Sequence, residues 1–248
     1  MFGTKKPIIA MLHLDPLPGD PRFGHDGGGL SDAVEHAKRD LDALQEGGVD
    51  GVIVSNEFSL PYQRHMDFVT PASMAYIVGQ LKSQLSVPFG VDAISDGLAC
   101  IELAAACEAN FVRGTFSGVY VGDGGLYNND FSMLMRRKAA LHLDNLKMLY
   151  FINPESDRNL DTRDLSEIAS STIFKVHPDG LCVSATAAGS DVSTGLIASV
   201  KKKNPEVAVG TYFKEGDRLE DENFNNVRVD VDRVREFMKV VSEVRSEI

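Results

Sequence analysis

Several polar residues come directly after short apolar runs, and their types are those that proteins use for acid/base chemistry. His13 and Asp15 follow the apolar residues 8–12, and Asn56 and Glu57 follow a second apolar run. Histidine is the side chain whose ordinary pKa lies nearest to neutrality, so His13 could exchange protons with a substrate, paired with Asp15 or Glu57. The alternative is that His13 is a hydrogen-bonded residue of the fold with no catalytic role.

Arg113 ends a further apolar run, and its planar guanidinium suits bidentate contact with a carboxylate or a phosphate. An internal ion pair with Asp92 is the competing interpretation. Gly210 and Thr211 come at the end of the last apolar run, where their backbone N–H groups could face a phosphate. The predicted substrate-binding residues are Arg113, Asn153, Ser184, Gly210 and Thr211.

Four acidic residues could hold Mg²⁺ through oxygen ligands: Asp15, Glu57, Asp92 and Asp123. Their spacing matches no diagnostic metal motif, so the identity of any cofactor stays open. The catalytic residues predicted from these positions are His13, Asp15, Asn56, Glu57, Asp92 and Asp123. Asp123 belongs to residues 115–129, a stretch rich in glycine and aromatic residues that predicts a long binding loop at the mouth of the site.

Apolar runs alternate with amphipathic stretches along the whole chain, which predicts alternating strands and helices. The strands are predicted at residues 8–12, 49–55, 87–92, 111–113, 147–152, 180–184 and 206–211. The predicted helix N-caps are Ser31, Thr70, Asp96 and Asp130. Right-handed crossovers place the carboxyl ends of parallel strands on one face, so the polar residues named above should converge there. These patterns predict a single α/β domain over residues 1–248.

The chain has 25 basic and 36 acidic residues among 248, a net charge of −11. A negative mean field repels phosphate, which argues against nucleic acid or an anionic membrane as the main partner. No apolar run reaches the roughly 18 residues of a transmembrane helix, and no signal peptide is expected. Cys100, Cys107 and Cys182 lack metal-ligand spacing and predict buried thiols in a reducing, cytoplasmic environment.

Five phrases along the chain resemble those of the BtpA family. They are HLDPLPGDPRF at 13–23, GGVDGVIVSN at 47–56, VPFGVD at 87–92, ANFVRGTFSGVYVGDGG at 109–125 and VGTYFKEG at 209–216. The blocks around His13 and around Arg113 are the most specific, whereas the others are common in βα-barrels. The resemblance implies a TIM-type barrel and transfers a fold more securely than a reaction.

The chain departs from the pattern of that family in three places. A βα unit with a Gly-Ser-Gly turn normally precedes the GTYFK strand, whereas here Asn204-Pro205 leads almost directly into it. A Lys-His pair after the fifth strand is replaced by Pro154-Glu155, and a Thr-Gly turn after the sixth is replaced by residues 185–189. Without that lysine, no Schiff-base nucleophile is expected at the mouth.

The missing unit leaves seven recognisable strands instead of eight. We expect either a strand gap before the last strand or direct pairing of the sixth and seventh strands, with the late phosphate site damaged in either case. Residues 217–229 are too polar for a buried strand. Open strand edges favour association, so we expect a homo-oligomer that covers the gap.

Two functions follow from these features. The first is an enzyme, or a former enzyme, that binds or transforms a small anionic, phosphorylated metabolite by acid/base chemistry at the barrel mouth. The second, implied by the resemblance, is a non-catalytic factor for assembly or stability of a membrane complex, as in photosystem I biogenesis. A metabolite or phosphate that co-purifies in the mouth would favour the first.

Overall fold

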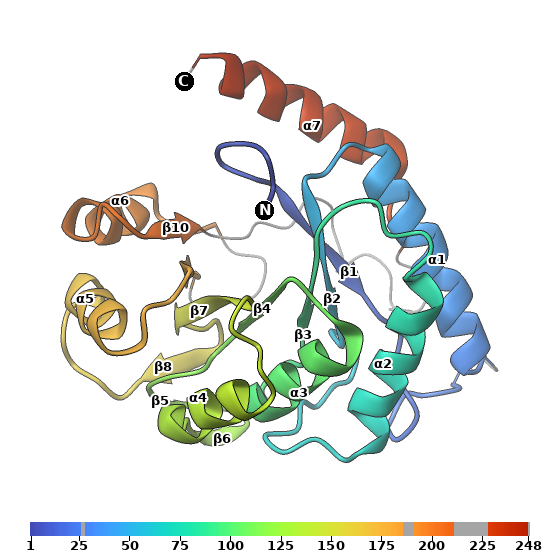
Figure 1. Ribbon diagram of the computed structural model, residues 1–248, viewed down its shortest axis with the longest axis horizontal. Helices are drawn as coiled ribbons and strands as arrows, with labels where there is room; N and C mark the ends of the chain where they lie inside the picture. The colour runs from blue at the N-terminus through green and yellow to red at the C-terminus, as the bar shows by residue number, and fades with distance from the viewer. Residues whose placement is uncertain (26–27, 186–190, 211–227, 248) are drawn as a thin grey trace.

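The computed structural model describes residues 1–25, 28–185, 191–210 and 228–247. Within them, seven parallel strands form one sheet in the order β1-β2-β3-β4-β7-β9-β10. The sheet curls with the helices outside it (Figure 1), so the predicted α/β barrel fold with seven recognisable strands is confirmed as a half-barrel. The strand bounds are β1 (Ile9–His13), β2 (Gly51–Ser55), β3 (Phe89–Asp92), β4 (Phe111–Gly114), β7 (Lys147–Asn153), β9 (Gly180–Val183) and β10 (Ala208–Gly210).

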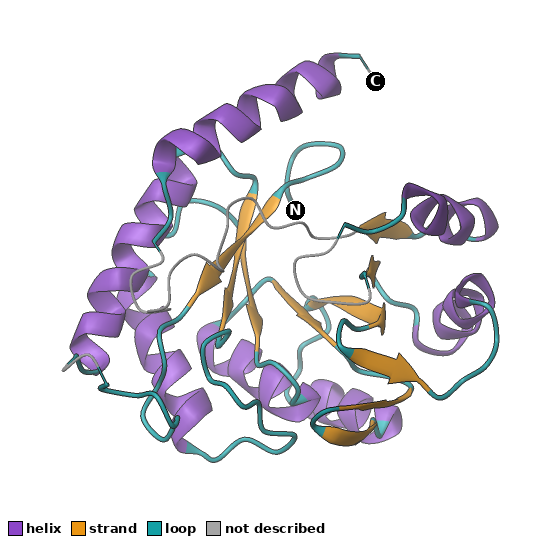
Figure 2. Cartoon of the chain, turned by 180° about the vertical axis from the view of Figure 1, so that it is seen from behind, coloured by secondary structure: helices purple, strands orange, loops and turns teal. Residues whose placement is uncertain are grey.

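The helices cover the outer face of the curled sheet (Figure 2). The hydrophobic core lies between the two layers, because alternate strand residues point outward. Val52, Val54 and Val112 share one fully buried cluster with helix residues such as Leu41 and Ile77. The helix bounds are α1 (Leu30–Glu46), α2 (Val69–Leu81), α3 (Gly97–Cys107), α4 (Phe131–Ala140), α5 (Leu165–Val176), α6 (Thr194–Lys203) and α7 (Val231–Ser246).

Two of the predicted helix caps are confirmed. The Asp96 carboxylate accepts hydrogen bonds from the backbone N–H groups of Leu98 and Ala99 at the start of α3. The Asp130 carboxylate accepts one from Met133 at the start of α4. Each carboxylate satisfies N–H groups that have no partner within the helix, and this fixes where the helix begins.

The other two predicted caps are wrong. The N-cap of α1 is Gly29, and the carboxylate of Asp32 accepts the Gly29 N–H at 2.7 Å, so Ser31 already lies inside the helix. The N-cap of α2 is Phe68, which places Thr70 in the first turn. In α1 the acidic side chain at the third helical position therefore accepts the N–H of the N-cap residue, which is the return bond of a capping box.

The last two strands of the sheet, β9 and β10, pair directly with each other. Ala208 lies opposite Gly180, and Gly210 lies opposite Cys182, in a parallel register. Of the two alternatives for the missing unit, direct pairing is therefore the one observed. Among the described residues β1 and β10 do not pair with each other, so the sheet is open between them. Thr211 and residues 217–227, which bear on an eighth strand, lie outside the described residues.

Aromatic rings occupy the amino-end part of the interior. Phe2 packs edge-on against Phe111, with ring centroids 5.7 Å apart. A Cβ atom at Gly90 would lie 2.4 Å from the Phe111 ring, and one at Gly51 would lie 2.7 Å from the Phe2 ring. Glycine is needed at both positions because the inner wall must leave room for these rings.

The stretch expected to be a long loop forms two strands of a small antiparallel sheet, β5 (Val119–Gly122) and β6 (Gly125–Asn128). The third strand, β8 (Asp157–Asn159), comes from later in the chain, and the order is β6-β5-β8. Tyr120 and Tyr127 lie opposite each other and are both buried. Two aromatic residues facing one side of a hairpin can be buried together, which is why this glycine-rich stretch becomes ordered over the mouth.

Candidate functional site

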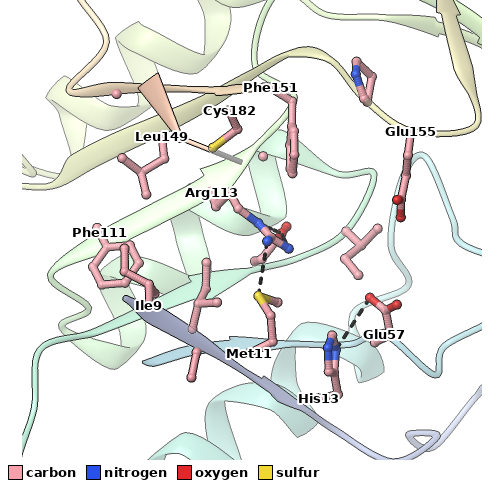
Figure 3. A pocket seen from close by; sticks show the side chains of 18 of the residues that line it. Ile9, Met11, His13, Glu57, Phe111, Arg113, Leu149, Phe151, Glu155 and Cys182 are labelled. Atoms are coloured by element: carbon pink, nitrogen blue, oxygen red, sulfur yellow. Dashed lines mark hydrogen bonds and ion pairs between the residues drawn. The ribbon is translucent and has the colours of Figure 1, made fainter. Parts of the chain in front are cut away.

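A cavity of about 1960 Å³ lies inside the curled sheet. Its wall includes inward-facing residues of β1, β4, β7, β9 and β10, together with residues of the loops above their carboxyl ends. Figure 3 shows the apolar side chains of Ile9, Phe111 and Leu149 on one side, Arg113 near the centre, and His13 with Glu57 on the other side. The predicted site residues that line this cavity are His13, Glu57, Asp92, Arg113, Asp123 and Gly210.

Strand register brings the polar residues together. His13 lies opposite Ser55 in β2, and Ser55 lies opposite Asp92 in β3. Because strand residues alternate between the two faces, these three side chains form one inward-facing row at the carboxyl ends. The positions at which the apolar runs end in the sequence therefore determine that these three residues share one row.

His13 lies between a hydroxyl and a carboxylate. Its Nδ1 atom is 3.1 Å from Ser55 Oγ and 3.6 Å from Glu57 Oε2, and its ring centroid is 6.2 Å from that of Phe58. The side chains of His13 and Glu57 are 16% and 17% exposed. A partly buried imidazole beside a carboxylate can take up and return a proton, because the carboxylate stabilises the imidazolium form.

Arg113 forms a buried ion pair with Asp92. The distances from Nε and Nη2 to Asp92 Oδ2 are both 2.9 Å. Burial raises the pKa of the Asp92 carboxyl, while the charge and hydrogen bond of Arg113 oppose this rise. Nη1 lies 3.1 Å from Met11 Sδ, and the guanidinium carbon lies 5.1 Å from the centre of the Phe151 ring. The internal ion pair is therefore present, and binding of an anion by Arg113 stays a prediction.

Asp15 lies outside the lining of this cavity as the described residues form it. Its carboxylate is 2.5 Å from His36 Nδ1 and accepts hydrogen bonds from Arg228 at 3.0 and 3.2 Å. These contacts join the loop after β1 to α1 and to the segment before α7. Glu57, and not Asp15, is therefore the carboxylate beside His13 in the structure.

Asn56 also lies outside the lining of the large cavity. It follows the inward-facing Ser55, so its side chain is turned away, and it is only 1% exposed. Its Oδ1 atom accepts the backbone N–H of Ile94 at 2.9 Å, which links the ends of β2 and β3. We predicted that His13, Asn56, Asp92 and Arg113 surround one pocket, and the structure brings only three of them together.

Two further predicted residues bind each other. The Asn153 amide donates to the Ser184 carbonyl oxygen at 2.6 Å and accepts the Ser184 backbone N–H at 3.1 Å. This reciprocal pair joins the ends of β7 and β9. Gly210 lines the cavity, whereas Thr211 lies outside the described residues.

The four carboxylates considered for Mg²⁺ do not gather around one point. Asp15 is engaged by His36 and Arg228, and Asp92 is engaged by Arg113. In the part of the chain that the structure describes, no group of three or more His, Cys, Asp or Glu residues could hold a metal ion.

Sequence reasoning missed Arg64 and Cys182 as cavity residues. Arg64 comes from the connection between β2 and α2, where no periodic pattern marks its direction. Cys182 was expected to be a buried thiol; it is partly buried and lines the cavity, and burial raises its pKa to about 11. The alternation of β9 could have placed Cys182 on the inner wall.

Among the described helices, none combines the length and the apolar character that a membrane crossing requires.

The model of the BtpA family matches residues 4–218. The putative sgc region protein SgcQ of Escherichia coli is 42% identical over 209 residues, covering 84% of this chain and 78% of SgcQ. The photosystem I biogenesis protein BtpA of Synechocystis is 32% identical over 192 residues, covering 76% of this chain and 66% of BtpA. The alignment with protein TK2179 of Thermococcus kodakarensis, 27% identical, spans 272 positions and covers 99% of this chain and 98% of TK2179. Since that is 24 positions more than the chain has residues, TK2179 has a stretch or stretches with no counterpart here, in agreement with a missing βα unit.

Two solved structures share the fold at low sequence identity. The 7,8-dihydropteroate synthase of Vibrio fischeri superposes with a TM-score of 0.51 at 12% identity, covering 85% of this chain and 74% of that enzyme. CdNal of Clostridium difficile, in complex with mannosamine, has a TM-score of 0.51 at 11% identity, covering 85% and 65%. At such identities the likeness supports the barrel fold alone.

Proposed function

We propose that this chain, which belongs to the BtpA family, is an enzyme acting on a small anionic, phosphorylated metabolite in the cavity at the carboxyl ends of its strands. The observation that carries this proposal is the imidazole of His13, partly buried on the cavity wall beside Glu57. A structural histidine would need only a hydrogen-bond partner. Here a carboxylate and a hydroxyl both lie near Nδ1 of a histidine on the cavity wall. Such surroundings suit an imidazole whose charge changes during a reaction.

His13 is the general acid and base in this proposal. Its Nδ1 atom faces Ser55 and Glu57, and the proposal assigns proton exchange with the ligand to Nε2. Glu57 stabilises the imidazolium form, and Ser55 fixes the orientation of the ring. The reaction class is proton transfer at a carbon or oxygen atom of the metabolite.

Arg113 orients the reacting end of the metabolite. Asp92 holds the guanidinium by Nε and Nη2, while Nη1 faces the thioether of Met11. A thioether sulfur is a weak acceptor, so a ligand oxygen that replaces this contact gains a stronger hydrogen bond.

Solvent-deuterium exchange tests this assignment. The purified chain is incubated in D₂O with a panel of sugar phosphates and phosphorylated hydroxy acids, and loss of C–H signals is followed by proton NMR. We expect exchange in one class of compound, reduced at least 100-fold in His13→Gln, because general acid and base catalysis contributes about 10²- to 10⁴-fold. The matched control is His25→Gln, an exposed histidine outside the cavity lining. Equal exchange rates in His13→Gln and the unsubstituted chain would remove His13 from the mechanism.

The non-catalytic alternative is favoured by one observation, the 32% identity to a protein named for photosystem I biogenesis. The absence of the Lys-His pair and of the Thr-Gly turn from this sequence agrees with it. A chain that catalyses no exchange in any compound and carries no metabolite after purification would support this second function.

The proposal also includes a cytoplasmic location and a homo-oligomer. The sheet is open between β1 and β10 in the described residues, and α7 exposes Val240 and Val244 by 52% and 51%. Unpaired strand edges and exposed apolar side chains each favour association with another copy. Sedimentation of the purified chain measures the oligomeric state directly.

A further inference from the structure

The guanidinium of Arg64 lines the cavity but makes no short polar contact within the described residues. Its Nη1 atom is 3.4 Å from Ser95 Oγ, and its Nη2 atom is 3.6 Å from Asp157 Oδ1. Charge-assisted hydrogen bonds are normally about 2.7–2.9 Å long, so both contacts are weak. The guanidinium carbon instead lies 4.1 Å from the centre of the Tyr127 ring. Arg64 is thus held mainly by an aromatic surface, which leaves its N–H groups suited to a stronger acceptor.

The small sheet above the mouth makes this aromatic surface rigid. Tyr127 is 8% exposed, and its hydroxyl donates to the Thr115 carbonyl oxygen at 3.3 Å. A Cβ atom at Gly124 would lie 3.2 Å from Arg64 Nη2, so the turn between β5 and β6 lies directly against the guanidinium. The Tyr127 ring and this turn restrict the guanidinium before any ligand arrives, which lowers the entropic cost of binding.

Ser95 is the second polar group at this place. It lines the cavity just before α3 and has a φ angle of +71°, which non-glycine residues rarely adopt. Strained residues of this kind concentrate at ligand sites. The Ser95 hydroxyl lies beside Nη1 of Arg64, so one ligand oxygen could contact both groups.

The negative charge of Asp157 opposes the binding of an anion beside Arg64. Its carboxylate lies near Nη2, on the part of the guanidinium not facing Ser95. A bound anion would gain from Arg64 and be opposed by Asp157. Arg113, in contrast, already has Asp92 at 2.9 Å, so much of its charge is compensated.

We propose that Arg64 and Ser95 form a subsite for the anionic group of the ligand, a phosphate or a carboxylate. This inference rests on the proposed function and extends it: the anion is anchored at Arg64, and Arg113 and His13 contact the other end of the molecule. The ligand class is a small molecule with one terminal anionic group and a proton-exchanging group further along.

Calorimetric titration of the full chain with inorganic phosphate, and separately with acetate, tests the subsite. We expect at least one probe to bind, and Arg64→Ala to lower its affinity at least 10-fold, because hydrogen bonds to a charged group are lost. Arg64→Lys should lose part of that affinity, since lysine cannot form the bidentate contact. Asp157→Asn should raise the affinity several-fold by removing the opposing charge. The matched control is Arg158→Ala, which removes an equal charge from an exposed neighbour outside the cavity lining.

Several results would overturn the subsite. They are equal affinity in Arg64→Ala and the unsubstituted chain, no gain in Asp157→Asn, or no binding of either probe by the unsubstituted chain. If Arg64→Ala does not fold, Arg64→Lys and Asp157→Asn decide the question. The experiments distinguish a wrong subsite from a wrong proposed function. Proton exchange that depends on His13, with phosphate affinity independent of Arg64, would refute the subsite alone. Phosphate affinity that depends on Arg64, with no proton exchange, would refute the enzyme alone.

Discussion

Replacing Arg113 with methionine should destabilise the fold strongly, because Asp92 would remain buried without its partner. Asp92 is 4% exposed in its side chain, and Arg113 is 14% exposed. Removing one member of a buried ion pair costs about 3–5 kcal/mol in the free energy of unfolding. For a chain of this size, each kcal/mol lowers the melting temperature by about 2–4 °C, so we expect a decrease of roughly 6–20 °C at pH 7.

The decrease should depend on pH. Burial raises the pKa of the Asp92 carboxyl in the folded protein, and Arg113 is the group that opposes this rise. Without Arg113 the folded-state pKa lies further above the unfolded value of about 3.9. A group with a raised folded-state pKa contributes stability below its unfolded pKa and loses it as the pH rises through the folded value. The deficit of Arg113→Met should therefore shrink as the pH is lowered from 7 towards 4.

Urea unfolding at a series of pH values measures this deficit. The matched control is Arg158→Met, at the exposed position of β8, which should change the free energy of unfolding little. A double variant, Asp92→Asn with Arg113→Met, should recover part of the loss, because no buried charge remains unpaired. The reasoning is refuted if Arg113→Met melts at the same temperature as the unsubstituted chain at pH 7 and shows no added dependence on pH.

Three further predictions concern the inner wall and one helix cap. Gly90→Ala should lower the free energy of unfolding by about 1–3 kcal/mol, because its Cβ atom would lie 2.4 Å from the Phe111 ring. Gly79→Ala should not destabilise the chain, because a Cβ atom there meets nothing within 4 Å. Urea unfolding compares the two variants. Asp96→Ala should lower the free energy of unfolding by about 0.5–2 kcal/mol, because the α3 cap is lost. The loss should exceed that of Asp130→Ala, since Asp96 also accepts the Met66 backbone N–H. Equal decreases in stability in thermal melts of the two variants would contradict this. The rate of Cys182 alkylation by iodoacetamide should be low at pH 7 and rise towards pH 11, because burial raises the pKa of this thiol to about 11. Mass spectrometry follows the rate against pH. A midpoint near the ordinary thiol pKa of about 8.5 would contradict the prediction.

The sheet could be predicted because its strands are short apolar runs at regular intervals. All seven predicted runs correspond to strands of the main sheet, and the shared direction of their carboxyl ends predicted that His13 and Asp92 lie together. Direct pairing of β9 and β10 was one of two alternatives, since the sequence shows that a unit is missing but not how the neighbours rearrange. Pairing between distant strands is decided by tertiary packing.

The parts that could not be predicted depend on side-chain direction at strand ends and in loops. Asn56 differs from Ser55 by one position and therefore faces the other way. Asp15 lies beyond the end of β1, where His36 and Arg228 determine its direction. The contact of Arg64 with Tyr127 joins the β2–α2 loop to strand β6, far apart in sequence, and no local pattern encodes it.

The most direct test of the proposed function is native mass spectrometry of the freshly purified chain, followed by phosphorus NMR of the small molecules released on denaturation. The cavity with His13, Arg113 and Arg64 on its wall predicts one bound phosphorylated compound, retained in Arg158→Ala and lost in Arg64→Ala. A chain that carries no small molecule, and that gains none when incubated with the panel of phosphorylated compounds, would contradict the proposal that this cavity is the site of a metabolic enzyme.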